Sequence, residues 1–350
     1  FVVSDDLSES ERAQLLGDID SVFAADFSNL DAEEFTTARE ALQESLTRIQ
    51  QGIGRRLAAV PGAARDPDSI TDAGAGLNVA YRTDEFEADI GSTPIGFEKS
   101  NIVGGVTWRP QVSENTRLSV TAERRAVKDS VLSYAGVKDP LTGETWGAVT
   151  RTGGKVGVEY DNGKSGAYAS AGAYVYQGEN VADNHSLDLN TGAYVRPINE
   201  PDRQLQIGVN LGYMSFDKNL RYFTYGHGGY FSPQDYVSIA FPISYQQRQD
   251  QWTYRVSAAP GFQRYEEDDA DVFPEDGDAQ ALLDTLATVG LVGQSRYDGE
   301  DESGFGMTLD GDVSYQLAPD LSVGGRVGYD TFGDYSETSA SVYLNYQMGA

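Results

Sequence analysis

The chain of 350 residues contains no cysteine, which removes several classes of protein from consideration. Without cysteine there is no disulfide framework and no zinc site ligated by thiolates. Only two histidines are present, His185 and His227. A catalytic histidine base or a transition-metal site therefore has few candidate residues. His185 adjoins Ser186, but neighbours in a strand point to opposite faces. We therefore expect no enzymatic activity, no metal site and no cofactor.

Long apolar runs and an excess of positive charge are missing as well. No segment approaches the ~18 apolar residues of a membrane-spanning helix, so a helical membrane protein is excluded. The formal net charge of -28 argues against nucleic acid as a partner, because phosphates require a basic surface. The chain starts at Phe1 rather than Met and shows no signal peptide, so we expect a mature fragment without its targeting segment.

The prominent feature that is present is a two-residue alternation of apolar and polar side chains, clear in 205–215, 236–245 and 305–317. In the first of these segments the apolar positions are Leu205, Ile207, Val209, Leu211 and Tyr213. Alternate side chains of a strand point to opposite faces, so each such segment has one apolar face and one polar face. Many long strands of this kind predict an all-β transmembrane barrel with an apolar outside and a polar lumen.

Turn residues separate sixteen predicted strands, an even number as expected for a bacterial single-chain barrel. They are placed at 74–82, 85–91, 101–109, 115–125, 131–136, 145–150, 152–161, 165–177, 184–196, 203–217, 235–248, 251–265, 288–297, 304–318, 320–331 and 337–348.

Short and long connections alternate along this series, as in outer-membrane barrels, whose periplasmic turns are short and whose outer loops are long. The short ones are at 162–163, 200–202, 249–250 and 319, and the longer ones at 137–144, 178–183, 218–234 and 266–303. The longest contains an acidic run, 266–278, which lacks the ligand spacing of an EF-hand and is interpreted as a solvated loop. A helical turn or two is expected at 279–287.

Residues 1–60 have a different pattern from the rest of the chain. Apolar residues spaced by three and four between Phe35 and Ile53 predict a helix, and a shorter helix is expected over 10–23. Proline and glycine residues then predict a linker over 61–73, followed by the barrel from 74 to 350.

One segment is unusually rich in aromatic residues and glycine: Arg221-Tyr222-Phe223-Thr224-Tyr225-Gly226-His227-Gly228-Gly229-Tyr230-Phe231-Ser232-Pro233-Gln234. It resembles the signature of the C-terminal barrel domain of cellulose synthase operon protein C, the bacterial cellulose exporter. Further segments are similar to that family and occur in the expected order, at 123–130, 133–136, 146–147, 151–153 and 178–184. The resemblance covers roughly 74–348. One departure is the end of the chain, Tyr346-Gln347-Met348-Gly349-Ala350, where such barrels usually end on an aromatic residue.

The resemblance implies a sixteen-stranded barrel in the outer membrane of a Gram-negative cell, downstream of a periplasmic array of tetratricopeptide repeats. The helical residues 1–60 would be the end of that array. The partners implied are cellulose, outer-membrane lipid and lipopolysaccharide, and the inner-membrane cellulose synthase complex, which the helical part would reach. A monomer is expected.

The candidate polysaccharide-binding residues come from the gating loop and from strand ends beside it. Sugars offer hydroxyls for hydrogen bonding and C–H faces for aromatic rings. The aromatic and loop candidates are Tyr222, Phe223, Tyr225, His227, Tyr230, Phe231, Trp146 and Tyr134. The charged and amide candidates, expected in the lumen or at turns, are Arg124, Arg125, Lys128, Asp129, Asp183 and Asn184.

Alternatives remain open for these residues and for the whole chain. The aromatics could pack the loop or form the interfacial girdle, the assignment favoured for Trp108 and Trp252. The charges could form a ladder that stiffens the barrel. The chain could export another exopolysaccharide, such as poly-N-acetylglucosamine or alginate, or act as a plugged structural anchor or receptor.

Overall fold

The structure is a computed structural model that describes residues 73–138, 143–288, 292–333 and 336–346. The helices expected within 1–60, and the linker up to residue 72, lie outside these described residues. Among the residues described, no helix is long and apolar enough to cross a membrane.

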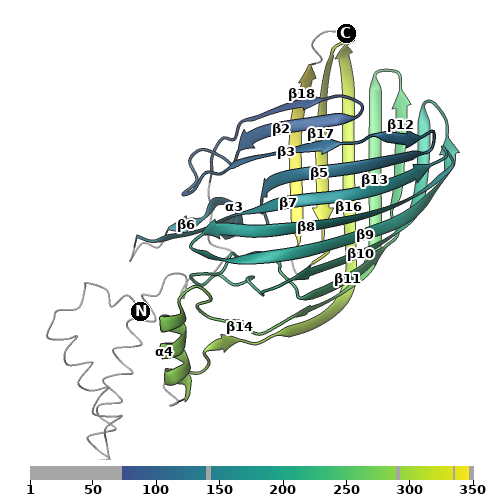
Figure 1. Ribbon diagram of the computed structural model, residues 1–350. Coiled ribbons are helices and arrows are strands. Elements are labelled where there is room, and N and C mark those ends of the chain that lie inside the picture. Colours follow the sequence, from purple (N-terminus) through teal and green to yellow (C-terminus); the bar gives the residue numbers. More distant parts are fainter. Residues whose placement is uncertain (1–72, 139–142, 289–291, 334–335, 347–350) are drawn as a thin grey trace, which may run out of the picture.

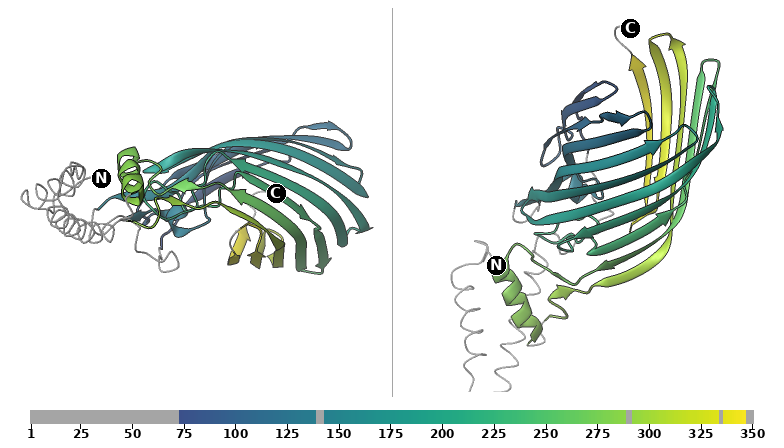
Figure 2. Two further views of the ribbon diagram at one scale, coloured as in Figure 1. Left: turned by 90° about the horizontal axis from the view of Figure 1, so that it is seen from below. Right: turned by 45° about the vertical axis from the view of Figure 1, so that its right-hand side comes forward.

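Of the eighteen strands in the described residues, sixteen belong to one antiparallel sheet, which confirms the predicted fold class and strand number. Its hydrogen-bonded path is β1-β2-β3-β5-β7-β8-β9-β10-β11-β13-β16-β17-β18, with β4, β6 and β12 pairing beside it. The sheet curls around an interior, so that β16 to β18 lie behind β3 to β9 in Figure 1, and Figure 2 shows the same curvature from two further sides.

The strands differ widely in length. Those of the sheet are β1 (Asn78–Arg82), β2 (Phe86–Ser92), β3 (Ile102–Trp108), β4 (Gln111–Ser113), β5 (Thr116–Ala126), β6 (Val137–Lys138), β7 (Thr145–Asp161), β8 (Ser165–Glu179), β9 (Val181–Asn199), β10 (Arg203–Phe216), β11 (Asp235–Ala240), β12 (Ile243–Gln249), β13 (Trp252–Glu267), β16 (Glu300–Ala318), β17 (Leu321–Asp330) and β18 (Glu337–Tyr346). A separate two-stranded sheet pairs β14 (Ala270–Asp271) with β15 (Arg296–Tyr297), and the helices within the described residues are α3 (Val131–Ala135) and α4 (Gly277–Thr288).

Alternation along the strands separates an apolar outer face from a polar inner face, as the sequence predicted. The outward positions are large, exposed and apolar; examples are Val79, Ile90, Val106, Val120, Val156, Leu189, Leu211, Val256, Leu309, Val327 and Val342. Trp108 and Trp252 are also exposed, and they lie at strand ends beside the short turns. An interfacial girdle of aromatic residues would occupy such positions. An apolar outer face on a curled antiparallel sheet is the arrangement of a barrel in lipid.

The two ends of the sheet differ in their connections. Short turns at 83–85, 162–164, 200–202, 250–251 and 319–320 lie at one end. The longer connections at 93–101, 127–144, 217–234 and 268–299 lie at the other end. The helix predicted near 279–287 is α4, within the longest of these connections.

Three predictions for individual elements were wrong. Residues 131–136 form helix α3 and its C-cap instead of a strand, because Ser130 and Ser133 make a capping box that starts a helix. The expected long connection at 178–183 is the single residue Asn180 (φ 48°), because β8 and β9 continue to pair up to Gly178 and Val181. The strand expected at 288–297 is reduced to β15.

Other differences concern where strands are divided. The predicted strands 145–150 and 152–161 are one strand, β7. The predicted strand 235–248 is split into β11 and β12 at Phe241 and Pro242, since proline has no amide hydrogen to donate to the ladder. The agreement on sixteen strands therefore includes compensating differences. Strands β4 and β6 were not predicted, while the predicted strands 131–136 and 288–297 are not part of the sheet.

Candidate functional site

The inner face of β3 to β10 forms the wall of a lumen. Two hollows of about 790 and 500 Å³ lie against it, and both are lined by Arg109, Lys155 and Asn190. Aromatic and polar side chains complete the lining: Tyr168, Ser170, Tyr194, Gln206 and Asn210 in the larger hollow, and Thr107, Thr121, Tyr174 and Asp188 in the smaller. A wall of this kind offers hydrogen-bonding groups beside the rings of tyrosines.

Most lumen arginines have a carboxylate close by. Arg125 donates to both oxygens of Asp89, at 2.5 and 2.6 Å, and to Glu123 at 3.2 Å. Arg151 shares Glu123 at 3.3 Å and lies 4.9 Å from the ring centre of Tyr174. Pairing lets each charge remain ionised beside opposite charge, so the wall is hydrated without a strong net field.

The same pairing recurs around the lumen. Arg196 contacts Asp161 at 2.7 Å and lies 4.8 Å from the ring centre of Tyr194. On the wall formed by β13, β16 and β17, Arg255 and Arg326 approach Asp312 at 3.1 and 3.4 Å. Such a surface suits a neutral polar ligand better than a strongly charged one.

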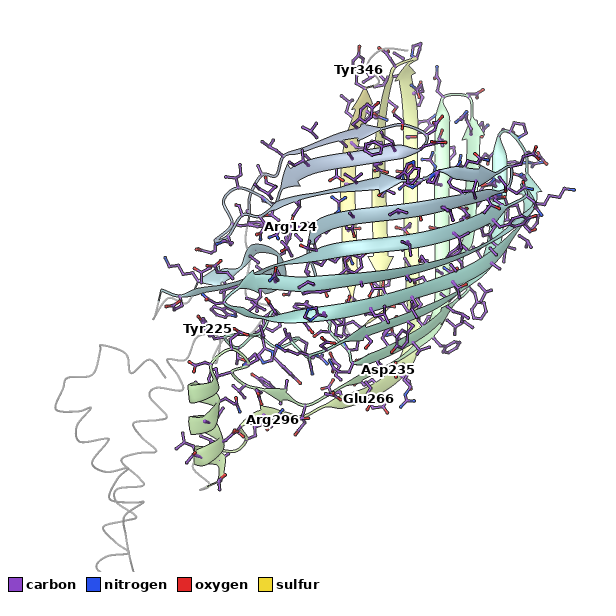
Figure 3. The ribbon with its side chains drawn as sticks, viewed as in Figure 1. Arg124, Tyr225, Asp235, Glu266, Arg296 and Tyr346 are labelled. Atoms are coloured by element: carbon purple, nitrogen blue, oxygen red, sulfur yellow. The ribbon has the colours of Figure 1, made fainter. Side chains whose placement is uncertain are left out.

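Three of the long connections fold together at one end of the sheet, and we name this assembly the cap: residues 127–138, 217–234 and 268–288 with 292–299. Figure 1 shows α3, β6, α4 and β14 gathered at that end, and Figure 3 labels Tyr225 and Arg296 there. The cap has its own small cores, one around Leu132 and Trp146 and another around Phe273 and Leu283.

Helix α3 begins the cap because of local hydrogen bonds. The hydroxyl of Ser130 accepts from the amide of Ser133 at 3.0 Å, and the hydroxyl of Ser133 accepts from the amide of Ser130 at 2.9 Å. The helix ends at Gly136, whose φ of 76° favours glycine. Leu132 is thereby fully buried against Val137 and Trp146, and Phe223 and Tyr225 pack on the same cluster.

Segment 217–234 folds back on itself through its glycines. The amides of Gly228 and Gly229 both donate to the carbonyl of Leu220, at 3.1 and 3.0 Å. Gly229 has a φ of 63°, and a Cβ there would lie 2.9 Å from the hydroxyl of Ser130. The tight return brings Tyr230 inside the molecule, where its ring stacks on Tyr176 with centroids 5.2 Å apart.

Several sequence-predicted residues hold this segment in place. Asn184 donates to the carbonyl of Lys218 at 2.7 Å and accepts from its amide at 2.9 Å. A carboxylate oxygen of Asp129 accepts from the amide of Phe231 at 3.0 Å, and burial raises the pKa of Asp129. Phe231 in turn contacts Tyr265 edge-on, with centroids 5.1 Å apart.

His227 joins segment 217–234 to the longest connection. It is fully buried, its Nε2 lies 2.8 Å from the carbonyl oxygen of Asp271, and burial lowers its pKa to about 4. Tyr222 and Tyr297 both contact the imidazole ring edge-on and stack on each other with centroids 3.7 Å apart.

The remaining predicted residues are dispersed. Tyr134 contacts Phe97 edge-on, and the ammonium of Lys128 lies 5.5 Å from the centre of the Tyr134 ring. Asp183, predicted near a turn, lies within β9 and accepts from Gln177. Arg124, predicted in the lumen, is exposed on the outer face, because it is in register with Gly104 between Ile102 and Val106.

The structure thus brings most of the predicted aromatics together in the cap, and it adds lumen residues that the prediction omitted. These are Lys155, Tyr168, Tyr174, Asp188, Asn190, Tyr194 and Arg196. The signal for them was present in the sequence, since they occupy the inward positions of the predicted strands 152–161, 165–177 and 184–196. Among the residues described, no cluster of three or more histidine, aspartate or glutamate side chains could hold a metal ion.

Comparison with known proteins identifies relatives over almost the whole chain. The family model described as cellulose synthase operon protein C C-terminus matches residues 10–349. Cellulose synthase operon protein C of Xanthomonas axonopodis pv. citri is 37% identical over 364 residues, covering 99% of this chain and 24% of the relative. That of Pseudomonas fluorescens is 36% identical and covers 81% of this chain and 22% of the relative.

The chain therefore spans about a quarter of the length of these relatives. Among solved structures, a bacterial polysaccharide outer membrane secretin superposes with a TM-score of 0.50 at 11% identity, covering 78% of this chain and 79% of that chain. At that identity the superposition supports the barrel fold alone.

Proposed function

Because the chain belongs to the cellulose synthase operon protein C C-terminus family and forms an outer-membrane barrel, we propose that it passes nascent β-1,4-glucan from the periplasm to the cell exterior. The transport is passive: polymerisation upstream supplies the force, and the barrel supplies a hydrated path. No chemical step on the polymer is assigned to the chain.

The side chains of the lumen wall are the main observation that supports this proposal. A glucan is uncharged, offers hydroxyls along its edges and has apolar C–H faces. Tyr168 and Lys155 line the larger hollow beside Ser170 and Asn190, while nearby arginines are paired with carboxylates. Many weak contacts, none of them strong, let a polymer slide without being trapped.

The direction of passage follows from the two ends of the barrel. Short turns face the periplasm and long loops face the exterior in outer-membrane barrels. The polymer would enter beside the turns at 162–164 and 200–202 and leave where the cap stands. The cap has to move aside for the polymer, so the predicted gating residues act through its packing as well as by direct contact.

Partners and further domains belong to the same proposal. The expected helical residues 1–60 would continue a periplasmic tetratricopeptide array toward the inner-membrane cellulose synthase complex. Residues 61–73 would link this part to the barrel. Because Ala75 pairs with Ile95 at the end of the sheet with the long connections, the chain would first have to pass from the periplasmic end to that end. The barrel would work as a monomer surrounded by outer-membrane lipid.

Planar-bilayer conductance of the purified protein tests the proposal. We expect long-lived, concentration-dependent current block by cello-oligosaccharides, and none by N-acetylated or α-linked oligomers. Tyr168→Ala should shorten the blocks about tenfold, the loss expected for about 1.4 kcal/mol of contact energy. The matched control is Tyr160→Ala, which removes an exposed tyrosine of the outer face.

Two other conductance results would favour a different function. Block by N-acetylated or anionic oligomers in place of cello-oligosaccharides would favour the export of another exopolysaccharide. Absence of conductance even after the cap contacts are removed would favour a plugged anchor.

A further inference from the structure

Arg124 lies on the face of the sheet that meets lipid. It is in register with Gly104 of β3 on one side and Thr152 of β7 on the other. On this face its neighbours along β3 are Ile102 and Val106, which are 71% and 45% exposed. The next residue, Arg125, points the opposite way and binds Asp89 in the lumen.

The backbone of Arg124 belongs to the sheet, but within the described part of the chain its guanidinium forms no hydrogen bond and no ion pair. This distinguishes it from Arg264, an arginine of the outer face that contacts Asp301 at 2.7 Å. An unpaired guanidinium beside hydrocarbon is unfavourable, and it is tolerated near the interface where it reaches an anion. The anion that satisfies Arg124 therefore has to come from outside the described protein.

The position of Arg124 along its strand indicates which leaflet supplies that anion. It stands near the end of β5, which runs to Ala126 and leads directly into the cap. The cap is built from the long connections, and such connections face the exterior. Arg124 thus lies at the level of the outer leaflet's polar groups, where lipid phosphates are found.

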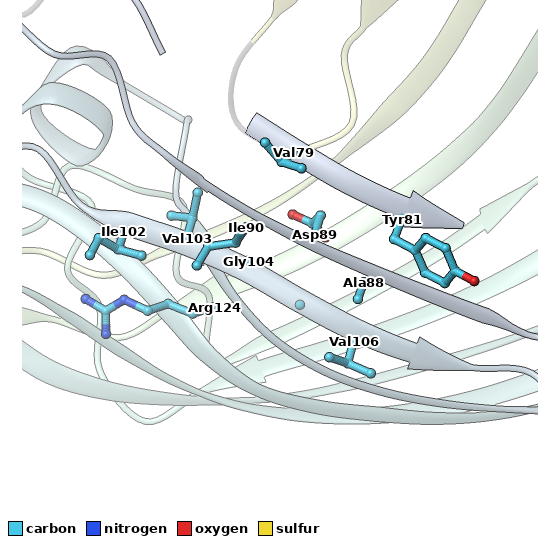
Figure 4. A pocket seen from close by; sticks show the side chains of 11 residues that line it. Val79, Tyr81, Ala88, Asp89, Ile90, Ile102, Val103, Gly104, Val106 and Arg124 are labelled. Atoms are coloured by element: carbon cyan, nitrogen blue, oxygen red, sulfur yellow. The ribbon is translucent and has the colours of Figure 1, made fainter. Parts of the chain in front are cut away.

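An apolar groove begins beside this guanidinium. It has a volume of about 510 Å³ and runs over β1, β2 and β3 (Figure 4). Its apolar lining consists of Val79, Tyr81, Ala88, Ile90, Ile102, Val103 and Val106. The groove exists because Ala88 and Gly104 are small and leave a depression between the larger side chains. A cation at the end of an apolar groove matches a molecule with an anionic head and a hydrocarbon chain.

We propose that this surface is a binding site for one phosphorylated acyl lipid of the outer leaflet. The phosphate would receive the paired N–H donors of Arg124, a geometry that guanidinium groups provide and ammonium groups do not. One acyl chain would lie in the groove over Gly104 and Ala88. The site is independent of the glucan path, because it lies on the opposite face of the sheet.

Native mass spectrometry of the whole protein in detergent, with added lipid A as the probe, tests this site. Arg124→Gln is expected to lower retained lipid A about tenfold, the factor that one charge-assisted contact commonly supplies. Ala88→Trp fills the groove without touching the arginine and should also lower retention. The matched control Arg264→Gln, which alters a paired outer-face arginine, should leave retention unchanged.

Three outcomes would overturn the proposal. Equal retention by the wild-type protein and Arg124→Gln would remove the role of the guanidinium. Equal retention of lipid A and its dephosphorylated form would remove the role of the phosphate. Full displacement by inorganic phosphate would reduce the site to an anion site without an acyl groove.

Heat-modifiable migration in gels shows that each variant is folded, and Ala88→Leu replaces Ala88→Trp if the latter fails that check.

Discussion

At the scale of single residues, His227 shows how burial makes the cap sensitive to acid. The imidazole is fully enclosed, and its Nε2 meets the carbonyl of Asp271. Its Nδ1 is buried without a hydrogen-bond partner among the residues described. A proton on that nitrogen would create a buried, uncompensated charge, which is why burial lowers the pKa of His227 to about 4.

We predict that acid opens the cap through this residue. The ordinary pKa of histidine is about 6.5, so above that pH neither the closed nor the opened cap carries the proton. As the pH falls from about 6.5 toward 4, only the opened cap takes up the proton, and the stability of the closed cap falls by about 1.4 kcal/mol per pH unit. Below pH 4 the loss levels off.

Hydrogen exchange of the amides of segment 217–234, corrected for the intrinsic effect of pH on exchange, measures this loss. His227→Gln should flatten the pH dependence between 6.5 and 4. His185→Gln serves as the control for the amides of 219–234, because His185 is exposed and its contact with Asp217 lies outside that range. The same slope in His227→Gln as in the wild type would show that another group, such as the buried Asp129, is responsible.

Arg124 and Arg125 show what the sequence could and could not say about single residues. Adjacent residues in a strand face opposite ways, so the pattern alone required that one of them leave the lumen. It pointed only weakly to Arg124: the outward series Leu118, Val120 and Ala122 continues there, but Val127 breaks the alternation on the other side. The register of β5 with β3 decides it, by setting Arg125 beside Asp89 and Arg124 beside the outward Ile102. Register across strands is a property of the folded sheet.

At the scale of elements, the cap depends on contacts between two connections far apart in the sequence. Besides the His227 contact, the hydroxyl of Thr224 donates to the carbonyl of Val272 at 2.8 Å. Arg221 contacts the buried Glu267 and, at 2.8 Å, Glu300. The stacked rings of Tyr222 and Tyr297 complete this interface. Hydrogen bonds and ion pairs make up most of these contacts, and water can replace such contacts when a closure opens.

We predict that locking this interface stops export reversibly. The chain has no cysteine, so Tyr222→Cys with Tyr297→Cys would introduce its only thiols. A short, cleavable bifunctional thiol reagent should then join the two connections, since the native rings are 3.7 Å apart. Secretion of polymer by cells carrying the linked protein should fall to background and recover when the reagent is cleaved.

The matched control links two strands and leaves the cap untouched. Val327 and Ala340 are register partners on β17 and β18, and a link between Val327→Cys and Ala340→Cys should not affect secretion. Normal secretion with the cap pair fully linked would mean that the polymer leaves without separating these two connections.

The sequence predicted the long strands well and the cap poorly. Long strands are specified by many alternating positions, so β9, β10 and β16 were found within a few residues of their ends. Helix α3 has five residues, too few for a periodic signal, and is set by the hydroxyls of Ser130 and Ser133. The cap's packing joins segments that are far apart in the sequence, such as 217–234 and 268–299, and no local pattern encodes contacts such as those of Thr224 with Val272 and of His227 with Asp271.

At the scale of the whole molecule, the direction of the strands determines how the barrel can close. Every pairing along the path from β1 to β18 is antiparallel. Because the path reverses direction an even number of times, β1 and β18 run the same way. Within the described part of the chain, neither the outer edge of β1 nor that of β18 is paired in the sheet. An unpaired edge in hydrocarbon is costly, so the edges have to be satisfied.

An antiparallel closure then requires an odd number of further strands between β1 and β18. We predict that β1 and β18 do not pair directly. One intervening strand places their Cα atoms about 10 Å apart, beyond the ~7 Å limit for a disulfide. Val79→Cys combined with Val342→Cys, and with neighbouring outward positions of β18, should therefore form no disulfide on oxidation. The register partners Val327→Cys and Ala340→Cys should form one. A disulfide between β1 and β18 would instead mean that the barrel closes through a parallel pair.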